Sequence, residues 1–334
     1  MRKVEVAFIG LALATVCPGF SHAAVTRSGG LDTNTLTTQV LLDRLGFSPG
    51  VIDGHKGTNL SRAIKGFQEA QGIDVTGELD APTRAALAKY SETPGTIEVT
   101  ITETDAAGPF VGPIPSDPAE QAKLPTMGYS DLTEELSERY HTTKPTLIAL
   151  NGSDASWAAG TKIKVPNVRP AATDYPAALK PDWKAELVQL SVSSDQPKAA
   201  RIVVSKSDGV LRVYDDQDKL VAQFPATMGS THDPLPIGNW KILGTSYLPH
   251  FHYNPALFWD AKATDTKETL QPGPNGPVGV VWMDLDKAHY GIHGTSSPET
   301  IGRTTSHGCI RLTNWDAARL SLMVKPDTPA VFQE

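Results

Sequence analysis

Hydrophobic periodicity changes character near residue 200, and this change limits the folds open to the chain more than any other feature. Before residue 150, apolar residues recur at the three- and four-residue intervals of helices, whereas beyond residue 200 they alternate with polar residues in short runs. Such runs, separated by turn residues, are typical of antiparallel strands. We therefore expect helical units first and a sheet-rich domain afterwards, and 334 residues suffice for two or three domains.

Composition excludes several classes of protein. Apolar residues make up 40% of the chain and charged residues 20%, which allows packed cores and argues against global disorder. The formal net charge of -7 argues against a nucleic-acid partner, because binding to phosphates usually needs a basic face. Two cysteines exclude a disulfide-rich scaffold and a cysteine-built zinc or iron–sulfur site.

Residues 1–23 have the pattern of a secretory signal peptide. Arg2 and Lys3 precede the apolar run Val6–Val16, and a small-x-small cleavage site follows at residues 21–23. The run is too short to cross a bilayer as a helix, which takes about 20 residues. We expect an exported protein of the periplasm or cell wall, with no membrane span in the mature chain.

Cleavage at this site also removes Cys17 and leaves Cys309 as the single thiol of the mature protein. Lipidation of Cys17 is disfavoured because Val16 stands where a lipoprotein signal needs a small residue. A single thiol has no internal disulfide partner, so Cys309 is an inert buried thiol, half of an intermolecular pair or a reactive nucleophile.

Residues 31–90 are predicted to form a small all-α domain. The pattern indicates a first helix near Leu36–Leu45, a second over 60–71 that stops at Gly72, and a third that begins at Asp80. The stretch resembles the peptidoglycan-binding domain attached to many wall hydrolases, through Leu45-Gly46-Phe47, Pro49-Gly50, Asp53-Gly54, Ala63-Ile64, Phe67-Gln68, Gly72-Ile73, Gly77, Thr83 and Leu87. The resemblance implies binding of glycan or stem peptide; a generic three-helix module is the alternative.

Residues 96–168 are predicted to form a small α+β module. A strand over 97–102, a loop over 106–125, two helices beginning near Leu132 and Thr143, and a strand over 162–165 follow one another. This order is similar to a degenerate LysM module, whose framework is matched by Leu136, Tyr140, Leu147, Leu150-Asn151, Gly160, Ile163 and Val165-Pro166. The module either binds sugar or serves as a spacer.

The proline-rich residues 169–198 are predicted to be a linker, and residues 200–334 a mainly β domain with a sheet or sandwich-like core. Alternating runs over 201–205, 210–214 and 219–224 are separated by Ser207-Asp208-Gly209 and by 215–218, which predicts hairpins. Further strands are expected over 239–243, 278–284 and 330–332. One helix is expected near Asp316–Met323, with Thr313 and Asn314 as cap candidates.

His293 and Cys309 are the candidate catalytic pair. A free thiol has a pKa of about 8.5 and is mostly protonated at neutral pH, so a nucleophilic cysteine needs a base such as imidazole. An imidazole that accepts the thiol proton can later protonate a leaving amine. Gly308 leaves room beside the sulfur, and the backbone N–H groups of Gly308 and Cys309 can face an oxyanion.

The segment His293–Asp316 resembles the catalytic motif of the L,D-transpeptidases, the YkuD domain family. Further matching positions are Met228-Gly229, Leu235-Pro236-Ile237-Gly238, Gly276-Pro277-Val278-Gly279 and Tyr290-Gly291-Ile292-His293. The resemblance implies Cys309 as the acylated nucleophile and His293 as the general base. It also implies supporting or substrate-side roles for Gly294, Ser306, His307, Gly308 and Arg311, with Gly294 orienting the imidazole through its carbonyl.

Some site residues keep an alternative reading. His307 is either a substrate contact or a packing residue, and Arg311 either supports the thiolate or pairs structurally with an acid. The loop 246–277 is either a cap over the substrate or an insertion on the domain's own sheet. Trp240 and Trp282 are expected in the core, and His250 and His252 at the surface.

A metal site built from His289, His293 and His307 is disfavoured. The first two have the spacing of a zincin helix but lack its glutamate, and on a strand about 13 Å would separate them. The resemblance implies no metal and no cofactor.

The resemblance implies an enzyme whose Cys309 forms a thioester with a peptidoglycan tetrapeptide stem and passes the acyl group to an amine. That amine belongs to a second stem, a lipoprotein lysine or a free D-amino acid. Two alternatives stay open: hydrolysis at the same site, as a carboxypeptidase or endopeptidase, and a non-catalytic wall-binding protein with an idle Cys309.

Overall fold

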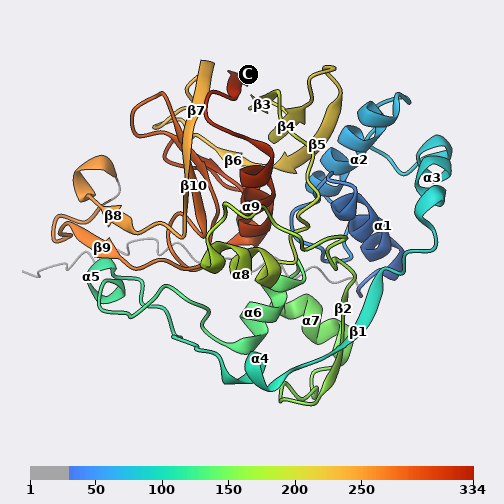
Figure 1. Ribbon diagram of the computed structural model, residues 1–334, viewed down its shortest axis with the longest axis horizontal. Helices are drawn as coiled ribbons and strands as arrows, with labels where there is room; N and C mark the ends of the chain where they lie inside the picture. The colour runs from blue at the N-terminus through green and yellow to red at the C-terminus, as the bar shows by residue number, and fades with distance from the viewer. Residues whose placement is uncertain (1–29, 260) are drawn as a thin grey trace, which may run out of the picture. The chain divides into compact units, whose positions relative to one another are not determined.

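The computed structural model describes residues 30–259 and 261–334 (Figure 1). The predicted signal peptide, Cys17 included, lies outside these residues. Residues 31–334 form one compact unit, so the contacts below lie within a single body. In the part of the chain that the structure describes, no helix is both long enough and apolar enough to span a membrane.

The N-terminal domain is helical, as the sequence predicts. It contains α1 (Thr33–Arg44), α2 (Thr58–Gln71), α3 (Ala81–Leu87) and the 3-10 turn η1 (Ala88–Tyr90). The Asp32 side chain caps α1 and the Asp80 side chain caps α3, each by accepting a backbone N–H of the first turn. Helix α2 ends at Gly72, whose φ of 66° is the left-handed conformation that glycine adopts most readily.

The middle module has the expected strand–helix–helix–strand order. Strands β1 (Thr96–Thr100) and β2 (Lys162–Pro166) are antiparallel, and α6 (Leu132–Arg139) and α7 (Lys144–Asn151) lie between them in sequence. The LysM assignment of this module stays a prediction. The prediction of a continuous loop over 106–125 was wrong in part, because two short helices, α4 (Glu103–Ala107) and α5 (Pro118–Gln121), lie in or overlap this stretch. Thr102 and Asp117 cap them, and this capping stabilises single turns in a Pro- and Gly-rich stretch.

The stretch 169–198, predicted as a linker, contains a packed helix, α8 (Pro181–Gln189). Trp183 and Leu187 on this helix are fully buried in the core of the C-terminal domain. The prolines that suggested a linker include Pro181, which occupies the first turn of the helix, where proline is tolerated. The segment is therefore held against the C-terminal domain along this helix.

The C-terminal domain is built on a nine-stranded sheet in the order β5-β4-β3-β13-β7-β10-β11-β12-β6. Its strands are β3 (Arg201–Ser205), β4 (Val210–Tyr214), β5 (Leu220–Pro225), β6 (Thr227–Met228), β7 (Gly238–Tyr247), β10 (Val281–Leu285), β11 (Gly291–His293), β12 (Ile310–Arg311) and β13 (Pro329–Gln333). The two edge strands, β5 and β6, follow one another in the chain with only Ala226 between them, so the sheet curls into a nearly closed barrel. The predicted mainly β domain is thus confirmed.

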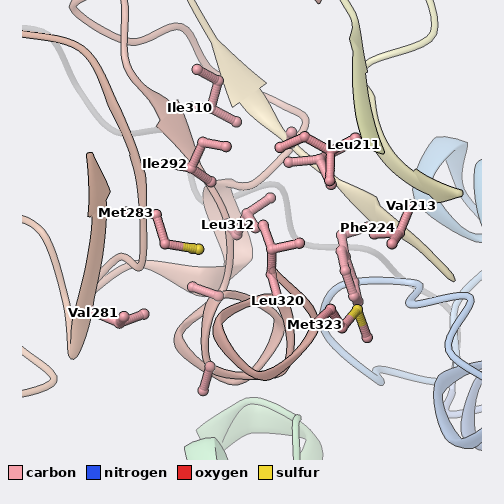
Figure 2. Close-up of a cluster of buried hydrophobic side chains, with 14 of the residues drawn as sticks. Leu211, Val213, Phe224, Val281, Met283, Ile292, Ile310, Leu312, Leu320 and Met323 are labelled. Carbon is pink, nitrogen blue, oxygen red and sulfur yellow. The ribbon is translucent and has the colours of Figure 1, made fainter. Parts of the chain in front are cut away.

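The core of this domain lies between the sheet and helix α9 (Asn314–Met323), which Thr313 caps (Figure 2). Ile292 of β11 and Ile310 of β12 are fully buried there, in the same hydrophobic cluster as Leu320 of α9. Because side chains alternate along a strand, their neighbours His293 and Arg311 face away from this core. Because the two isoleucines point into the core, the candidate site lies on the opposite face of these strands.

The helical N-terminal domain packs on the β5 edge of the sheet, where Figure 1 shows α2 alongside β5. The Ser48 N–H donates to the Gln223 carbonyl over 2.9 Å, and the Gln223 side chain donates to the carbonyl of Arg62 over 2.6 Å. A side chain at Gly66 would collide with Gln223, at 2.8 Å. This close approach covers a strand edge that would otherwise be open to other chains.

Candidate active site

His293 ends strand β11, and Cys309 directly precedes the neighbouring parallel strand β12. Ile292 of β11 pairs with Ile310 of β12, and His293 pairs with Arg311. Cys309 directly precedes β12, and its sulfur contacts the backbone of His289 and Gly291 at the start of β11. The loop 294–308 connects the end of β11 to Cys309 and allows β12 to run parallel to β11.

The Cys309 side chain is half-buried, and its S–H group forms a contact with the backbone. Its sulfur donates to the carbonyl of His289 over 3.6 Å, a contact that only the thiol can make. Burial raises the pKa of Cys309, while the Gly291 backbone and the Arg311 charge oppose that rise. Arg311 thus favours the thiolate, but desolvation of the sulfur outweighs it.

The His293 ring is buried, with 4% of its surface exposed, and its tautomer is fixed. Its Nδ1–H donates to the Gly294 carbonyl over 2.7 Å, so Nε2 is the nitrogen that can accept a proton. This is the contact that the family resemblance implies for Gly294. Burial lowers the pKa of His293 to about 3, and the Arg311 charge adds to the effect.

The resting pair is therefore a neutral thiol and a neutral imidazole rather than a thiolate–imidazolium pair. The unprotonated Nε2 can accept a proton, but the burial that lowers the pKa of His293 also makes it a weaker base in this resting state.

Ser306 and Gly308 shape the loop that carries the nucleophile. The Ser306 hydroxyl donates to the Cys309 carbonyl over 2.6 Å and accepts the N–H of Gly229 over 2.7 Å. Gly308 has φ of 97°, and a side chain there would meet the Tyr290 ring at 2.6 Å. Only glycine satisfies both conditions, so these contacts fix the backbone on either side of the sulfur.

His307 lies under the long loop that follows β7. This loop contains a small hairpin of β8 (Phe251–Tyr253) and β9 (Glu268–Leu270), with the 3-10 turn η2 (Pro255–Leu257) between them. Phe258 and Trp259 from its tip contact the His307 ring at centroid distances of 5.3 and 5.9 Å. The Trp259 side chain remains 59% exposed. The loop thus contacts the candidate motif at His307, and the exposed Trp259 lies beside that contact.

Two residues of the site were not singled out as functional by sequence reasoning. Trp282, expected in the core, is only partly buried and stacks on the His293 ring, with centroids 5.4 Å apart, because β10 places it directly opposite His293. Asn314, expected only as a helix cap, has its side-chain oxygen against Gly279 and Gly294. Trp240 is likewise only partly buried, whereas His250 and His252 are exposed as predicted.

The described residues hold no group of three or more His, Cys, Asp or Glu side chains placed to bind a metal ion. His289, His293 and His307 do not form one.

Comparison with known proteins identifies two domains. Residues 199–332 match the family model of the YkuD L,D-transpeptidase catalytic domain, and residues 32–87 match the model described as "Putative peptidoglycan binding domain". The chain is 30% identical over 200 residues to "Putative L,D-transpeptidase YkuD" of Bacillus licheniformis, covering 58% of this chain and 89% of that relative.

Other relatives match over shorter stretches. "Putative L,D-transpeptidase YkuD" of Bacillus subtilis is 48% identical over 58 residues, or 17% of this chain and 35% of that protein. "Probable L,D-transpeptidase YbiS" of Escherichia coli is 29% identical over 141 residues, or 39% of this chain and 44% of that protein.

Among solved structures, an L,D-transpeptidase from Xylanimonas cellulosilytica is similar with a TM-score of 0.38 and 14% identity, over 91% of this chain and 95% of that one. An L,D-transpeptidase from Mycobacterium smegmatis has a TM-score of 0.33 and 21% identity, over 40% of this chain and 58% of that one.

Proposed function

Because this chain belongs to the YkuD family of L,D-transpeptidases, we propose that it exchanges amide bonds in peptidoglycan stem peptides through a thioester on Cys309. The observation that carries the proposal is the pairing of β11 with β12, which brings Cys309, directly before β12, close to the strand that carries His293, whose Nδ1–H is tied to Gly294. That arrangement directs the basic Nε2 away from Gly294 and leaves it for the thiol.

In the first half-reaction, His293 Nε2 accepts the thiol proton as Sγ attacks the carbonyl carbon between an L-centre and the terminal D-residue of a tetrapeptide stem. The oxyanion that forms faces the backbone N–H groups at Gly308 and Cys309. The C–N bond then breaks, and the amine of the D-amino acid leaves with the proton from His293. The product is a thioester between the stem and Cys309.

In the second half-reaction, an amine attacks the thioester carbonyl and gives its proton to His293. The C–S bond breaks, and the proton returns to the sulfur. A second stem as acceptor gives a cross-link, a lipoprotein lysine gives an anchored protein, and a free D-amino acid gives exchange. Attack by water gives hydrolysis at the same site.

The helical domain supports peptidoglycan as the partner. A groove of about 620 Å³ lies between its three helical segments, with Lys56 and Arg84 among the lining residues. We propose that this domain holds the wall, and that the protein works outside the cytoplasm after removal of residues 1–23. Sedimentation with isolated peptidoglycan tests the first statement, and N-terminal sequencing of the exported chain tests the second.

Incubation of the mature chain with tetrapeptide muropeptides, followed by mass analysis, tests the reaction. Dimers that appear with loss of one D-amino acid support transpeptidation, whereas tripeptides alone indicate the hydrolase. No product from the wild-type chain, with Cys309 unmodified, indicates the non-catalytic wall-binding protein.

A further inference from the structure

Asn314 contacts both the middle module, at Glu138, and the backbone that follows β11, at Gly294. It is the first residue of α9, three positions after Arg311. Its side-chain oxygen accepts the Val280 N–H over 3.2 Å and lies against two glycines. A side chain added at Gly279 or Gly294 would come within 1.9 or 2.0 Å of this oxygen. The amide therefore occupies a slot that exists only because both positions are glycine.

The other end of the same amide is held from the middle module. Asn314 Nδ2 donates to Glu138 Oε1 over 2.7 Å and to the Pro274 carbonyl over 3.2 Å. Glu138 belongs to α6, far from Asn314 in sequence, and is buried, with 7% of its surface exposed. An acid at this place accepts the amide N–H and so selects the rotamer in which the amide oxygen points at the glycines.

Gly294 connects this slot to the chemistry. Its carbonyl accepts the Nδ1–H of His293 over 2.7 Å and thereby sets the tautomer and the ring orientation of the base. A shift of the Gly294 backbone moves that carbonyl, and the imidazole with it. Displacements on the order of 1 Å at a catalytic group can reduce rates about a hundredfold.

We propose that Glu138 is a positioning residue for the catalytic base, acting through Asn314 and Gly294. The proposal rests on the function proposed above, in which His293 is the general base. It gives the middle module a role in catalysis that is independent of sugar binding.

Three substitutions at Glu138 separate positioning from simple packing. Glu138→Met removes the acceptor but keeps the volume, Glu138→Asp withdraws the acceptor by one methylene, and Glu138→Gln keeps an accepting oxygen. Burial raises the pKa of Glu138 to about 8, so the acid is mostly neutral at pH 7 and glutamine reproduces it. Ser48→Ala is the matched control, because the Ser48 hydroxyl also bonds α9 across a buried interface, at Asp316, without contact to Gly294.

The measurements use the full mature chain. One is the rate constant for acylation of Cys309 by a carbapenem, read by intact mass. The other is the Nδ1–H resonance of His293 in ¹⁵N-histidine-labelled protein. We expect Glu138→Met and Glu138→Asp to slow acylation about tenfold to a hundredfold and to shift or broaden that resonance. Glu138→Gln and Ser48→Ala should keep wild-type values of both.

Wild-type acylation rates in Glu138→Met and Glu138→Asp would overturn the proposal, and so would an equal slowing in Ser48→Ala. Should Glu138→Met fail to fold, the Glu138→Asp result decides alone. These outcomes differ from a failure of the proposed function, in which the wild-type chain itself would show no adduct on Cys309.

Discussion

At the scale of single residues, the site is defined by two opposite pKa shifts on neighbouring groups. Burial raises the pKa of the Cys309 thiol and lowers that of the His293 imidazole, so both groups rest in their neutral forms. Arg311 acts on both groups: its charge favours the thiolate and disfavours the imidazolium. For proton transfer from Cys309 to His293 these two effects act against each other, because the transfer forms a thiolate and an imidazolium together.

This reading predicts how Cys309 responds to pH. Alkylation by iodoacetamide should rise with pH and have its midpoint above the usual thiol range, because the raised pKa leaves little thiolate at pH 7. Arg311→Met removes a charge that lowers this pKa, so its midpoint should move further up and the rate at pH 8 should fall. Arg303→Met, an exposed change in the loop before β12, should keep the wild-type midpoint. A midpoint that falls in Arg311→Met would contradict the account.

Part of the site could be predicted from the residues alone. The candidate pair His293 and Cys309 stands out because a lone thiol near a histidine and glycines is a recognisable pattern. Trp282 could not be placed in the same way, since its stacking on His293 depends on the β10–β11 register, which no local pattern sets. Asn314 likewise reads locally as a helix start, and its contact with Gly294 exists only after α9 packs against the sheet.

At the scale of elements, the strands with strong alternation were predictable and the shortest ones were not. The runs over 201–205 and 210–214 match β3 and β4 because period-2 alternation and turn residues agree there. Strands β6, β11 and β12 hold two or three residues each, too few to show a period, and their pairing is set by the sheet around them. Helix α8 was missed because its prolines suggested a linker.

The loop before β12 makes a prediction of its own. Gly308→Ala should slow Cys309 acylation at least tenfold, because a side chain at φ of 97° is strained and would overlap the Tyr290 ring. The same substitution combined with Tyr290→Ala removes the overlap but keeps the strain, so it should recover only part of the rate. Carbapenem acylation followed by mass measures both. A Gly308→Ala chain with the wild-type rate would show that this backbone does not position the sulfur.

At the scale of the whole molecule, the three domains share one buried polar network around α9. Arg319 of α9 forms two hydrogen bonds with Asp43 of α1, at 3.0 and 2.8 Å, and Asp43 also contacts His141 of the middle module. The His141 ring stacks on Trp315, with centroids 4.9 Å apart. The accessory domains are therefore built into the catalytic domain rather than tethered to it.

Asp43→Asn tests this integration. The change removes the carboxylate that forms both hydrogen bonds to the buried Arg319 and leaves only Asp316, 3.5 Å away, as its acidic neighbour. Breaking a buried pair costs about 3–5 kcal/mol. We expect the free energy of unfolding in urea to fall by that amount. Asp218→Asn is the control, because it breaks the exposed pair with Arg201 and should cost less than about 1 kcal/mol. Equal, small losses in both variants would mean that the network contributes little to the fold.

The buried acids give the molecule a pH-dependent stability. Burial raises the pKa of Glu138 to about 8, with Glu186 and Glu134 adding to it, and raises that of Glu186 to about 7 with a contribution from Glu135. The folded state therefore binds more protons than the unfolded state between about pH 4.5 and these values, and stability falls as pH rises through that window. Below pH 6.5, His293 acts in the opposite direction, because its lowered pKa makes the unfolded state bind the extra proton.

Between pH 6.5 and 8 the effect of the buried acids is not opposed by His293, and we expect the free energy of unfolding to decline there as pH rises. Glu138→Gln combined with Glu186→Gln should make that decline shallower, since glutamine does not titrate; the remainder comes from Asp316, whose pKa burial raises to about 7. Urea unfolding at several pH values measures it. A wild-type curve that is flat or rises across this interval would refute the assigned protonation states.

The central claim is that the sulfur of Cys309 carries the acyl group and that His293 is its base. The direct measurement is intact and peptide mass of the mature chain after brief exposure to a carbapenem, for the wild type, Cys309→Ala and His293→Ala. We predict one adduct on Cys309 in the wild type, none in Cys309→Ala, and acylation slowed about 10²–10⁴-fold in His293→Ala. An adduct on another residue, or undiminished acylation without His293, would contradict it.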